Sequence, residues 1–353
     1  MRERLDWGVI GTGGIASDFT EALLASERCK VVNVTGTSPL KARAFADRFG
    51  ISASAADLAE LLADRSVKAV YIATPHPCHE AQALASIEAG KHVLCEKPLT
   101  TDAASTARVV EAARQRGVFL MEAFMYRCHP LMHDLLPLLR EGVIGPLRHV
   151  RADFAFRVPR HPQGRLFDLK LGGGGILDVG GYPVSFARLL AGVVEGAPFA
   201  EPVKVDAVGV IGPTGADEFT TALLTFASGF AATVTSGVFH DAGTNAVIFG
   251  EQGKIVLPNP WIPGGQRQGL ETGFTIWRDG KSPETVAVRA TKSTYAIEAE
   301  LVADTLPATE AAWPAMSWAD SAGNMRALDA WRAALLAGAR EMTGSTLVGH
   351  QRL

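Results

Sequence analysis

The sequence has few cysteines, no excess of charge of one sign and no long apolar run. Four cysteines in 353 residues are too few for a disulfide framework. A net charge of −3 and the lack of a Lys/Arg-rich block exclude the electrostatic signature of a nucleic-acid binder or a polybasic membrane anchor. No uninterrupted apolar run approaches the roughly 18 residues of a membrane span, and the first residues form no signal-peptide core. We therefore expect a cytoplasmic protein without nucleic-acid or membrane partners.

Length and composition favour a folded chain of two domains. At roughly 100–200 residues per domain, 353 residues are enough for two hydrophobic cores. Apolar residues make up 47% of the chain and charged residues 20%, which argues against disorder. Glycine is over-represented, because 36 glycines are about 10% of the chain against a usual ~7%. The positions of these glycines give the first indication of function.

Strands and helices alternate in the first third of the chain. Short apolar runs predict strands, and apolar residues at three- and four-residue spacing predict helices. Short connections between alternating elements indicate a parallel sheet with right-handed crossovers. The predicted strands are 5–10, 30–34, 69–73, 92–95 and 118–121, and the predicted helices are 19–25, 40–49, 58–63, 80–89 and 102–116.

The pattern changes after about residue 125 to strands separated by turns. After a helix at 130–141, strands are predicted at 147–156, 203–211, 220–226, 230–238, 245–249, 254–257 and 274–277, then helices at 295–306 and 317–338. We predict a doubly wound α/β Rossmann domain at 1–122 and an α+β domain at 123–353 with a large, mainly antiparallel open sheet. Because such a sheet needs its second face covered, we expect a homodimer or homotetramer that forms through it.

A glycine-rich turn follows the first predicted strand and opens a helix. Gly11-x-Gly13-x-x-Ala16 has the spacing and context of a dinucleotide fingerprint. The first glycine permits a tight turn, the second lets backbone amides approach a pyrophosphate, and the small alanine allows close packing. The helix N-terminus then favours the anion. The alternative is a tight turn that binds nothing. The predicted contacts are Gly11, Thr12, Gly13, Gly14, Ile15 and Ala16.

The end of the second strand bears on which nucleotide binds. NAD sites usually carry an acidic residue about 20 residues after the glycines, but residues 33–38 contain none. Thr37 and Ser38 offer hydroxyls for a 2′-phosphate, and Lys41 or Arg43 offers positive charge. These residues favour NADP over NAD, the alternative being that they are only solvated helix residues.

Four further motifs carry a family resemblance. They lie at 70–76 (VYIATPH), 89–98 (AGKHVLCEKP), 121–127 (MEAFMYR) and 172–182 (GGGGILDVGGY). With the glycine turn, and with 295–300 and 324–329 near the end, they resemble the Gfo/Idh/MocA oxidoreductases, in particular the dihydrodiol/D-xylose dehydrogenase-like branch. The resemblance covers nearly the whole chain. It implies NAD(P)-dependent hydride transfer between nicotinamide and a carbinol or ketone carbon of a sugar, polyol or cyclic diol.

The resemblance implies that Lys97 acts at the reacting oxygen. Members of the family commonly have a cis peptide before the proline of the Glu-Lys-Pro element, here Pro98. Lys97 also follows a strand, at the edge where ligands of open α/β sheets bind. Its ammonium would bond the reacting oxygen, while Glu96 would help to place the cofactor. The alternative is a surface lysine at a turn.

Tyr182 and Asp178 complete the predicted catalytic set. They are four residues apart, which places them on one face of a helix. Removal of a proton from a hydroxyl needs a base, and a tyrosine serves only if a cation stabilises its phenolate. We predict Tyr182 as general acid/base, Lys97 as its partner, and Asp178 as a contact for a substrate hydroxyl or for Lys97. The alternative for Tyr182 is an aromatic that packs two domains together.

The remaining predicted contacts are less specific. Thr74, Pro75, His76 and His79 are expected near the cofactor, although a plain turn histidine is an equal alternative for His79. Arg127 is expected on cofactor or substrate, with an ion pair to Glu122 as the alternative. No metal is expected, because His76, Cys78, His79 and Cys95 match no common zinc spacing. The predicted substrate contacts are Lys97, Phe154, Arg157, Asp178, Tyr182 and Trp261, with Arg165 nearby; packing is the alternative for the aromatic and arginine residues.

Two other functions remain open at this point. One is an NAD-dependent glycoside hydrolase of the same fold, and the other is a non-catalytic NAD(P)-binding regulator. An intact lysine–tyrosine pair argues against a regulator, because a pure binder needs no proton relay.

Overall fold

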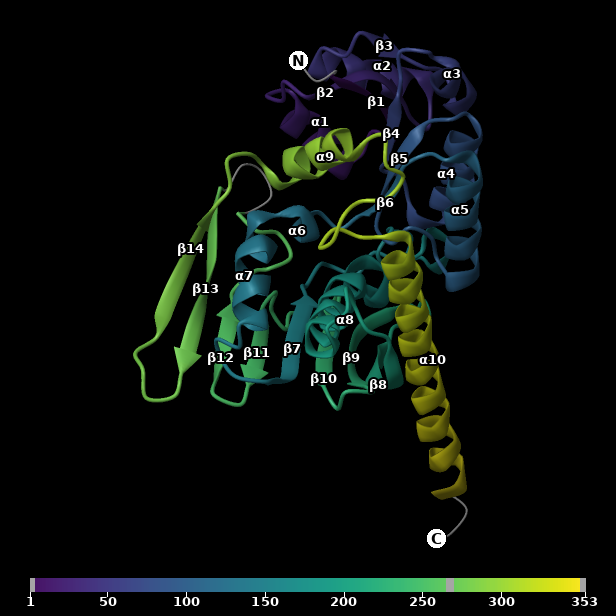
Figure 1. Cartoon of the computed structure of the whole chain (residues 1–353). Helices are drawn as coiled ribbons and strands as arrows, with labels where there is room; N and C mark the ends of the chain where they lie inside the picture. The colour runs from purple at the N-terminus through teal and green to yellow at the C-terminus, as the bar shows by residue number, and fades with distance from the viewer. Residues whose placement is uncertain (1–3, 265–269, 350–353) are drawn as a thin grey trace. The chain divides into compact units, whose positions relative to one another are not determined.

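The computed structural model describes residues 4–264 and 270–349 and forms two compact units (Figure 1). Within the described residues, the first unit draws on Met1–Asp134, Ile262–Thr272 and Ala287–Ala322, and the second on Leu135–Trp261, Gly273–Val286 and Gly323–Leu353. The sequence analysis expected contiguous domains. The structure differs because two late segments return to the first unit, where Trp318 Nε1 donates to the Leu120 carbonyl at 3.1 Å.

The first unit contains a six-stranded sheet in the order β3-β2-β1-β4-β5-β6. Each described pair of neighbours is parallel. This is the strand order of the doubly wound dinucleotide-binding fold, which changes direction between β1 and β4. The predicted fold of this part of the chain is confirmed. Its strands are β1 Leu5–Ile10, β2 Cys29–Thr35, β3 Ala53–Ser54, β4 Ala69–Ile72, β5 His92–Glu96 and β6 Leu120–Ala123.

Local sequence signals set the ends of the helices between these strands. Ser38, Asp57 and Asp102 each accept a backbone N–H and so begin a helix. Gly50 and Gly117 end two of the helices in the left-handed conformation that glycine favours. The helices between these strands are α1 Gly14–Leu23, α2 Pro39–Phe49, α3 Leu58–Ala63, α4 His79–Glu88 after a short 3₁₀ turn, and α5 Ala103–Arg116. After β6 come α6 Met125–Cys128 and α7 Pro130–Arg140, and α9 Thr294–Thr305 comes late in the chain.

The second sheet has eight strands in the order β14-β13-β12-β11-β7-β10-β9-β8. β7 and β10 pair in parallel, and the pairs β8–β9, β9–β10, β7–β11, β11–β12 and β12–β13 are antiparallel. A large, mainly antiparallel sheet was predicted and is confirmed. Its strands are β7 Leu147–Ala155, β8 Pro202–Ile211, β9 Asp217–Phe226, β10 Ala231–Gly237, β11 Ala246–Gly250, β12 Gly253–Leu257, β13 Glu271–Arg278 and β14 Glu284–Arg289.

One face of this sheet is covered by a long helical stretch. A π-helical turn at Ile176–Gly180 leads into α8, Gly181–Glu195, which packs on β7 and β10. The whole stretch Leu169–Glu195 is long and apolar enough to cross a membrane by length and composition alone. Our sequence analysis counted only uninterrupted apolar runs and did not find it. In the structure 94% of its most apolar 18-residue window is buried, as in a core helix. The last helix is α10, Trp318–Gly349.

Candidate active site

A cavity of about 780 Å³ opens at the carboxyl ends of β1, β2 and β4 in the first unit. Residues 11–13, 35–37 and 73–75, which follow these three strands, line it. This is the edge at which open α/β sheets bind ligands, and β1 and β4 flank the point where the strand order reverses. The volume lies within the range of small-molecule and cofactor sites.

The glycines of the first turn leave room where a pyrophosphate needs it. Gly11 has φ +119°, and a Cβ there would lie 2.5 Å from the Ala73 carbonyl oxygen, so its role is a close backbone approach. A Cβ at Gly13 or Gly14 would meet nothing within 4 Å. Gly13 is the N-cap of α1 and supplies no capping side chain. The first amides of α1 therefore face open space, and the site fits an anion.

The side of the cavity next to β2 is cationic. Thr37, Lys41 and Arg48 line it, and its lining, all within the described residues, includes no Asp or Glu. Arg43 lies elsewhere, in an ion pair with Asp47 at 2.9 Å. Lys41 therefore stands where the sequence predicted positive charge and Arg43 does not. Arg48 was missed, although its spacing of seven from Lys41 on one helix was a signal that the two share a face.

Ser38, Ile15 and Ala16 serve the ends and packing of helices. The Ser38 hydroxyl accepts the Lys41 N–H at 3.3 Å and so caps α2, which gives it a structural role in place of the predicted phosphate contact. Ile15 and Ala16 lie in the first turn of α1, and Ala16 is buried. These two residues position the helix N-terminus.

Glu96 is the last residue of β5, Lys97 follows it, and buried polar side chains surround Glu96. The Lys97–Pro98 peptide is cis, as the resemblance implied. The Tyr71 hydroxyl donates to Glu96 Oε1 at 2.5 Å, and the Tyr71 ring stacks on Phe19 with centroids 3.8 Å apart. Below them, Glu298 of α9 is fully buried, and neither carboxyl oxygen has a hydrogen-bond partner among the described residues. Burial, and then the charge of Glu96, raises the pKa of Glu298 well above its usual range.

His79 holds two loops together and is not free to bind a ligand. Its side chain is fully buried, with Nδ1 2.8 Å from the Pro98 carbonyl and Nε2 2.8 Å from the Thr74 carbonyl. Burial lowers the pKa of His79. Both ring nitrogens face backbone, so the predicted cofactor contact is replaced by a structural one. His76 is also buried, with its ring 5.8 Å from that of His79, while Thr74 and Pro75 line the cavity.

Arg127 is a buried structural residue of the first unit. Its Nη2 lies 2.8 Å from Asp320, and its Nε donates to the Pro314 carbonyl at 2.6 Å. The guanidinium is fully buried in this pairing. These bonds replace the predicted contact with cofactor or substrate, and they identify an ionic partner other than Glu122. The signal was invisible in the sequence because that partner is 193 residues away.

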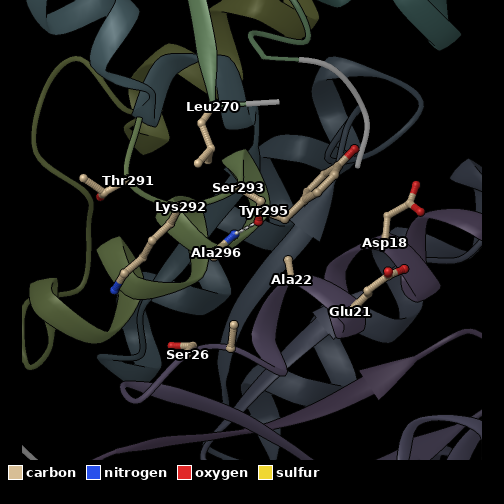
Figure 2. Close-up of a pocket in the computed structure, with 11 residues that line it drawn as sticks. Asp18, Glu21, Ala22, Ser26, Leu270, Thr291, Lys292, Ser293, Tyr295 and Ala296 are labelled. Carbon is tan, nitrogen blue, oxygen red and sulfur yellow. Dashed lines mark hydrogen bonds between the residues drawn. The ribbon is translucent and has the colours of Figure 1, made fainter. Parts of the chain in front are cut away.

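A second cavity of the first unit, of about 390 Å³, lies beside α1 and the start of α9 (Figure 2). Asp18 and Glu21 of α1 line it together with Lys292, which pairs with Glu300 at 2.6 Å. None of the predicted site residues lines this cavity, although Tyr295 and Ala296 of the 295–300 stretch do. Within residues 4–264 and 270–349, no group of three or more His, Cys, Asp or Glu side chains is placed to hold a metal ion.

In the second unit, Tyr182 lies in an aromatic cluster. Its ring centroid is 5.2 Å from that of Phe154 and 6.3 Å from that of Trp261. Trp261 is fully buried and donates its Nε1–H to the Asp153 carbonyl at 2.8 Å. The indole has no exposed face for a sugar, so the predicted stacking on substrate is replaced by support of Phe154 and Tyr182.

Asp178 lies in the π-helical turn and pairs with Arg165 at 2.6 Å. Its side chain is buried, while that of Arg165 is 46% exposed. The sequence analysis placed Asp178 and Tyr182 on one helical face because residues four apart share a face in an α-helix. That geometry does not apply unchanged here, because Asp178 is in a π turn and Tyr182 is in the first turn of α8. Such π segments are frequent at functional sites. Arg157 lies on the Phe239 ring, 5.6 Å from its centroid, which gives it a packing contact.

The four glycines that precede this turn are constrained by backbone conformation or by close contacts within the second unit. Gly172 has φ +74° and ends a 3₁₀ turn. A Cβ on Gly173 would lie 2.9 Å from the Asp168 backbone, one on Gly174 would lie 2.1 Å from Asp217 Oδ1, and one on Gly175 would lie 3.1 Å from the Gly237 backbone. A run of four glycines before candidate catalytic residues suggests a backbone approach to ligand, but the crowding around this run comes from the second unit itself.

Comparison with known proteins agrees with this architecture. Residues 5–124 match the oxidoreductase family's NAD-binding Rossmann fold, and residues 133–256 match the Gfo/Idh/MocA C-terminal domain. The two matches together span more than half of the chain. The chain belongs to the Gfo/Idh/MocA oxidoreductase family. Its membership explains the order of the two domains and the Glu-Lys-Pro element after β5.

Relatives within the family act on hydroxyl or keto groups. The chain is 38% identical to mouse trans-1,2-dihydrobenzene-1,2-diol dehydrogenase over 261 residues, 73% of this chain and 76% of the relative. The human protein of the same name is 35% identical over 262 residues, 73% and 76% of the two chains. Among solved structures, a 3-ketoreductase from Actinomadura kijaniata in complex with NADP and TDP-benzene has a TM-score of 0.81 and 29% identity, covering 94% of this chain and 98% of the other.

Proposed function

We propose that this chain is an NADP(H)-dependent oxidoreductase that transfers a hydride between nicotinamide and a carbinol or ketone carbon of a sugar, polyol or cyclic diol. The observation that carries the proposal is the cavity at the ends of β1, β2 and β4, where open helix amides and two cations face the same space. Relatives that are diol dehydrogenases, and a structural neighbour that is a ketoreductase with NADP, support the reaction class.

The residues of the cavity fit a dinucleotide phosphate. The free amides at Gly13 and Gly14 would hold the pyrophosphate, and Lys41 and Arg48 would hold a 2′-phosphate through charge-assisted hydrogen bonds. Thr74 and Pro75 would border the nicotinamide half, with Glu96 held in place by Tyr71. When bound, the nicotinamide supplies the hydride chemistry, and the chain's part is to bind, orient and move a proton.

We assign the proton to Tyr182 and its charge balance to Lys97. An ordinary tyrosine titrates near 10, so its phenolate needs a nearby cation at neutral pH. In this proposal Lys97 would supply that cation and would also polarise the reacting oxygen. Asp178 would bind a substrate hydroxyl, with Arg165 holding its carboxylate in place. Solved structures of the Actinomadura ketoreductase include variants in which one lysine or one tyrosine is replaced, the same two residue types.

The test is turnover on a panel of sugars, polyols and diols, with both cofactors, followed by absorbance of the reduced nicotinamide. We expect net NADPH formation from free NADP with at least one substrate. Lys97→Ala and Tyr182→Phe should each lower kcat by about 10²–10⁴-fold, the usual effect of removing acid–base catalysis. Lys30→Ala, which replaces an exposed lysine on β2, is the matched control. Turnover within threefold of wild type for Lys97→Ala would overturn the assignment, and tightly retained NAD without net reduction would favour a glycoside hydrolase.

Cofactor preference has its own test. Removing Lys41 or Arg48 by alanine substitution should raise the KM for NADP about 10-fold, since a hydrogen bond to a charged group contributes about 1.5–3 kcal/mol, and should change the KM for NAD less than twofold. Arg43→Ala is the control, because that side chain pairs with Asp47 outside the cavity. Equal effects of all three variants would contradict a 2′-phosphate site at Lys41 and Arg48.

We further propose that the chain forms a homodimer or homotetramer through the second sheet. On the face that α8 does not cover, cross-strand pairs place Val208 beside Thr221 and Leu223 beside Thr233. Val208 is 73% exposed and Leu223 44% exposed, and Trp277 on β13 is 45% exposed. Exposed apolar side chains over several strands indicate an interaction surface. A cytoplasmic location also remains part of the proposal, with four free thiols as its support.

The oligomer is tested by mass in solution. Sedimentation of the wild type at micromolar concentration should give a dimer or tetramer, and Leu223→Glu should shift it towards monomer by placing a charge in the surface. Leu40→Glu, which changes an exposed leucine on α2 away from this sheet, is the control. A monomeric wild type would overturn this proposal.

A further inference from the structure

Asp217, the first residue of β9, directs its carboxylate at the start of the helical stretch that bears Asp178 and Tyr182. The Ile176 N–H donates to Asp217 Oδ2 at 2.6 Å. A Cβ on Gly174 would lie 2.1 Å from Oδ1, so the backbone of the glycine run rests directly on the carboxylate. All of these residues belong to the second unit.

This carboxylate replaces a helix cap that the local sequence lacks. The N-cap of the π turn is Gly175, which supplies no capping side chain. Helix N-termini leave backbone N–H groups unpaired, and an acidic group there stabilises them by hydrogen bonding and by the helix dipole. Asp217 supplies that group from a strand 41 residues away in the chain.

The cap is joined to the candidate catalytic side chains by a short stretch of backbone. The Asp178 N–H donates to the Gly174 carbonyl at 3.1 Å, within the same turn that Asp217 holds. Asp178 is the second residue after Ile176, and Tyr182 follows in the first turn of α8. The packing around the turn is tight, because a Cβ on Gly175 would lie 3.1 Å from the Gly237 backbone.

We infer that Asp217 is a positioning residue, which fixes the π-helical turn and through it the orientation of Asp178 and Tyr182. The inference rests on the proposed function for its activity readout, and on the fold alone for its stability readout. Replacing Gly174 by any other residue would disturb the same contact, which gives this glycine a reason to be where it is.

The charge state of the cap makes the inference measurable. Desolvation raises the pKa of Asp217 to about 6, although N–H groups of Ile176 and Gly175 and the charge of Arg332 on α10 favour the ionised form. Among the described residues beside this turn, Asp178 pairs with Arg165 and Glu218 of β9 with Arg160, while the Asp168 carboxylate accepts the Lys170 N–H at 2.9 Å. A protonated Asp217 offers one acceptor oxygen fewer to these N–H groups, so the local hold on the turn weakens as the pH falls through about 6, even though neutralising the desolvated charge adds to the global stability of the fold.

The experiment compares the wild type with Asp217→Asn and a control, Asp47→Asn, whose exposed carboxylate on α2 pairs with Arg43. Turnover is measured from pH 5 to 9, with KM for NADP, and the urea midpoint is measured at pH 5 and 7.5. The wild type should stay folded at pH 5 and show an acid limb in kcat with an apparent pKa of about 6. Asp217→Asn should lower kcat at pH 8 about 10- to 100-fold, the cost of a small misplacement of reacting groups, and lose that limb. Its KM for NADP should stay within twofold.

The stability readout separates positioning from folding. A carboxyl with a raised pKa in the folded state contributes stability at low pH that is lost as the pH rises through the folded pKa. Asp217→Asn removes that loss. The urea midpoint of the variant minus the urea midpoint of the wild type should therefore be larger at pH 7.5 than at pH 5. An unchanged kcat and acid limb would overturn the inference, as would a variant without cooperative unfolding at pH 7.5. If neither the wild type nor the variants turn over any substrate, the proposed function fails. The midpoints still test the inference in that case, and the same pH dependence in Asp217→Asn as in the wild type would overturn it.

Discussion

The two glycine runs of this chain differ in what surrounds them. At Gly13 and Gly14 an added Cβ meets nothing within 4 Å, whereas at Gly174 it lies 2.1 Å from a carboxylate oxygen. The first run leaves space that a ligand's phosphates fit. The second run brings backbone against backbone and against Asp217, so that the turn before α8 can close. Similar composition therefore leaves open space in one unit and allows close packing in the other.

The largest expected effect is at the packed run. Gly174→Ala should lower the free energy of unfolding by about 2–4 kcal/mol, because it adds a clash and forces a side chain into a strained backbone region. Urea unfolding measures this. Gly196→Ala is the matched control, since its φ is +68° but a Cβ there meets nothing within 4 Å, and it should cost only about 1 kcal/mol. Equal losses at the two positions would mean that the contact with Asp217 adds nothing.

At the first glycine run we expect the reverse of the effect at Gly174: a loss of cofactor binding with little loss of stability. Gly13→Ala should raise the KM for NADP about 10-fold or more by filling space that the pyrophosphate needs, while the unfolding free energy should change by less than about 0.5 kcal/mol. Cofactor titration by fluorescence and urea unfolding give the two values. A loss of stability without a change in cofactor affinity would make the two runs alike and remove the distinction drawn between them.

The smallest effect is expected at Gly14, the first helical residue of α1. Gly14→Ala should raise the free energy of unfolding by about 0.5 kcal/mol through better helix propensity. Because this position is variable in the fingerprint, the KM for NADP should change less than threefold. Thermal and urea unfolding check the first expectation. A large loss of affinity would extend the ligand-filled space from Gly13 to Gly14.

Much of the fold was predictable because the pattern is local. Alternating apolar runs located all but β3 of the first sheet, and glycines located helix ends. The sequence analysis began the first helix at residue 19 although α1 begins at Gly14, because glycine is a poor helix former and concealed the first turn. β14 was missed because four of its six residues are exposed and its apolar run, 286–288, is only three residues long.

The site was predictable only where a motif is contiguous. The glycine turn and the Glu-Lys-Pro element are short and lie where expected. Arg127, His79 and Trp261 were misjudged because their roles depend on burial and on backbone carbonyls from other segments. Asp217 gave no local signal, because a cap supplied by a distant strand does not appear in the spacing around the helix that it serves.

The return of late segments to the first unit has a consequence for synthesis. Arg127 leaves the ribosome long before Pro314 and Asp320, to which it binds in a fully buried site. At about 5–20 residues per second, the 193 residues between Arg127 and Asp320 take roughly 10–40 s to follow. Burying the guanidinium before the Asp320 carboxylate arrives would cost several kcal/mol, so this site stays open until then. The nucleotide-binding unit is therefore the first to begin on the ribosome and cannot be completed until nearly the whole chain has emerged.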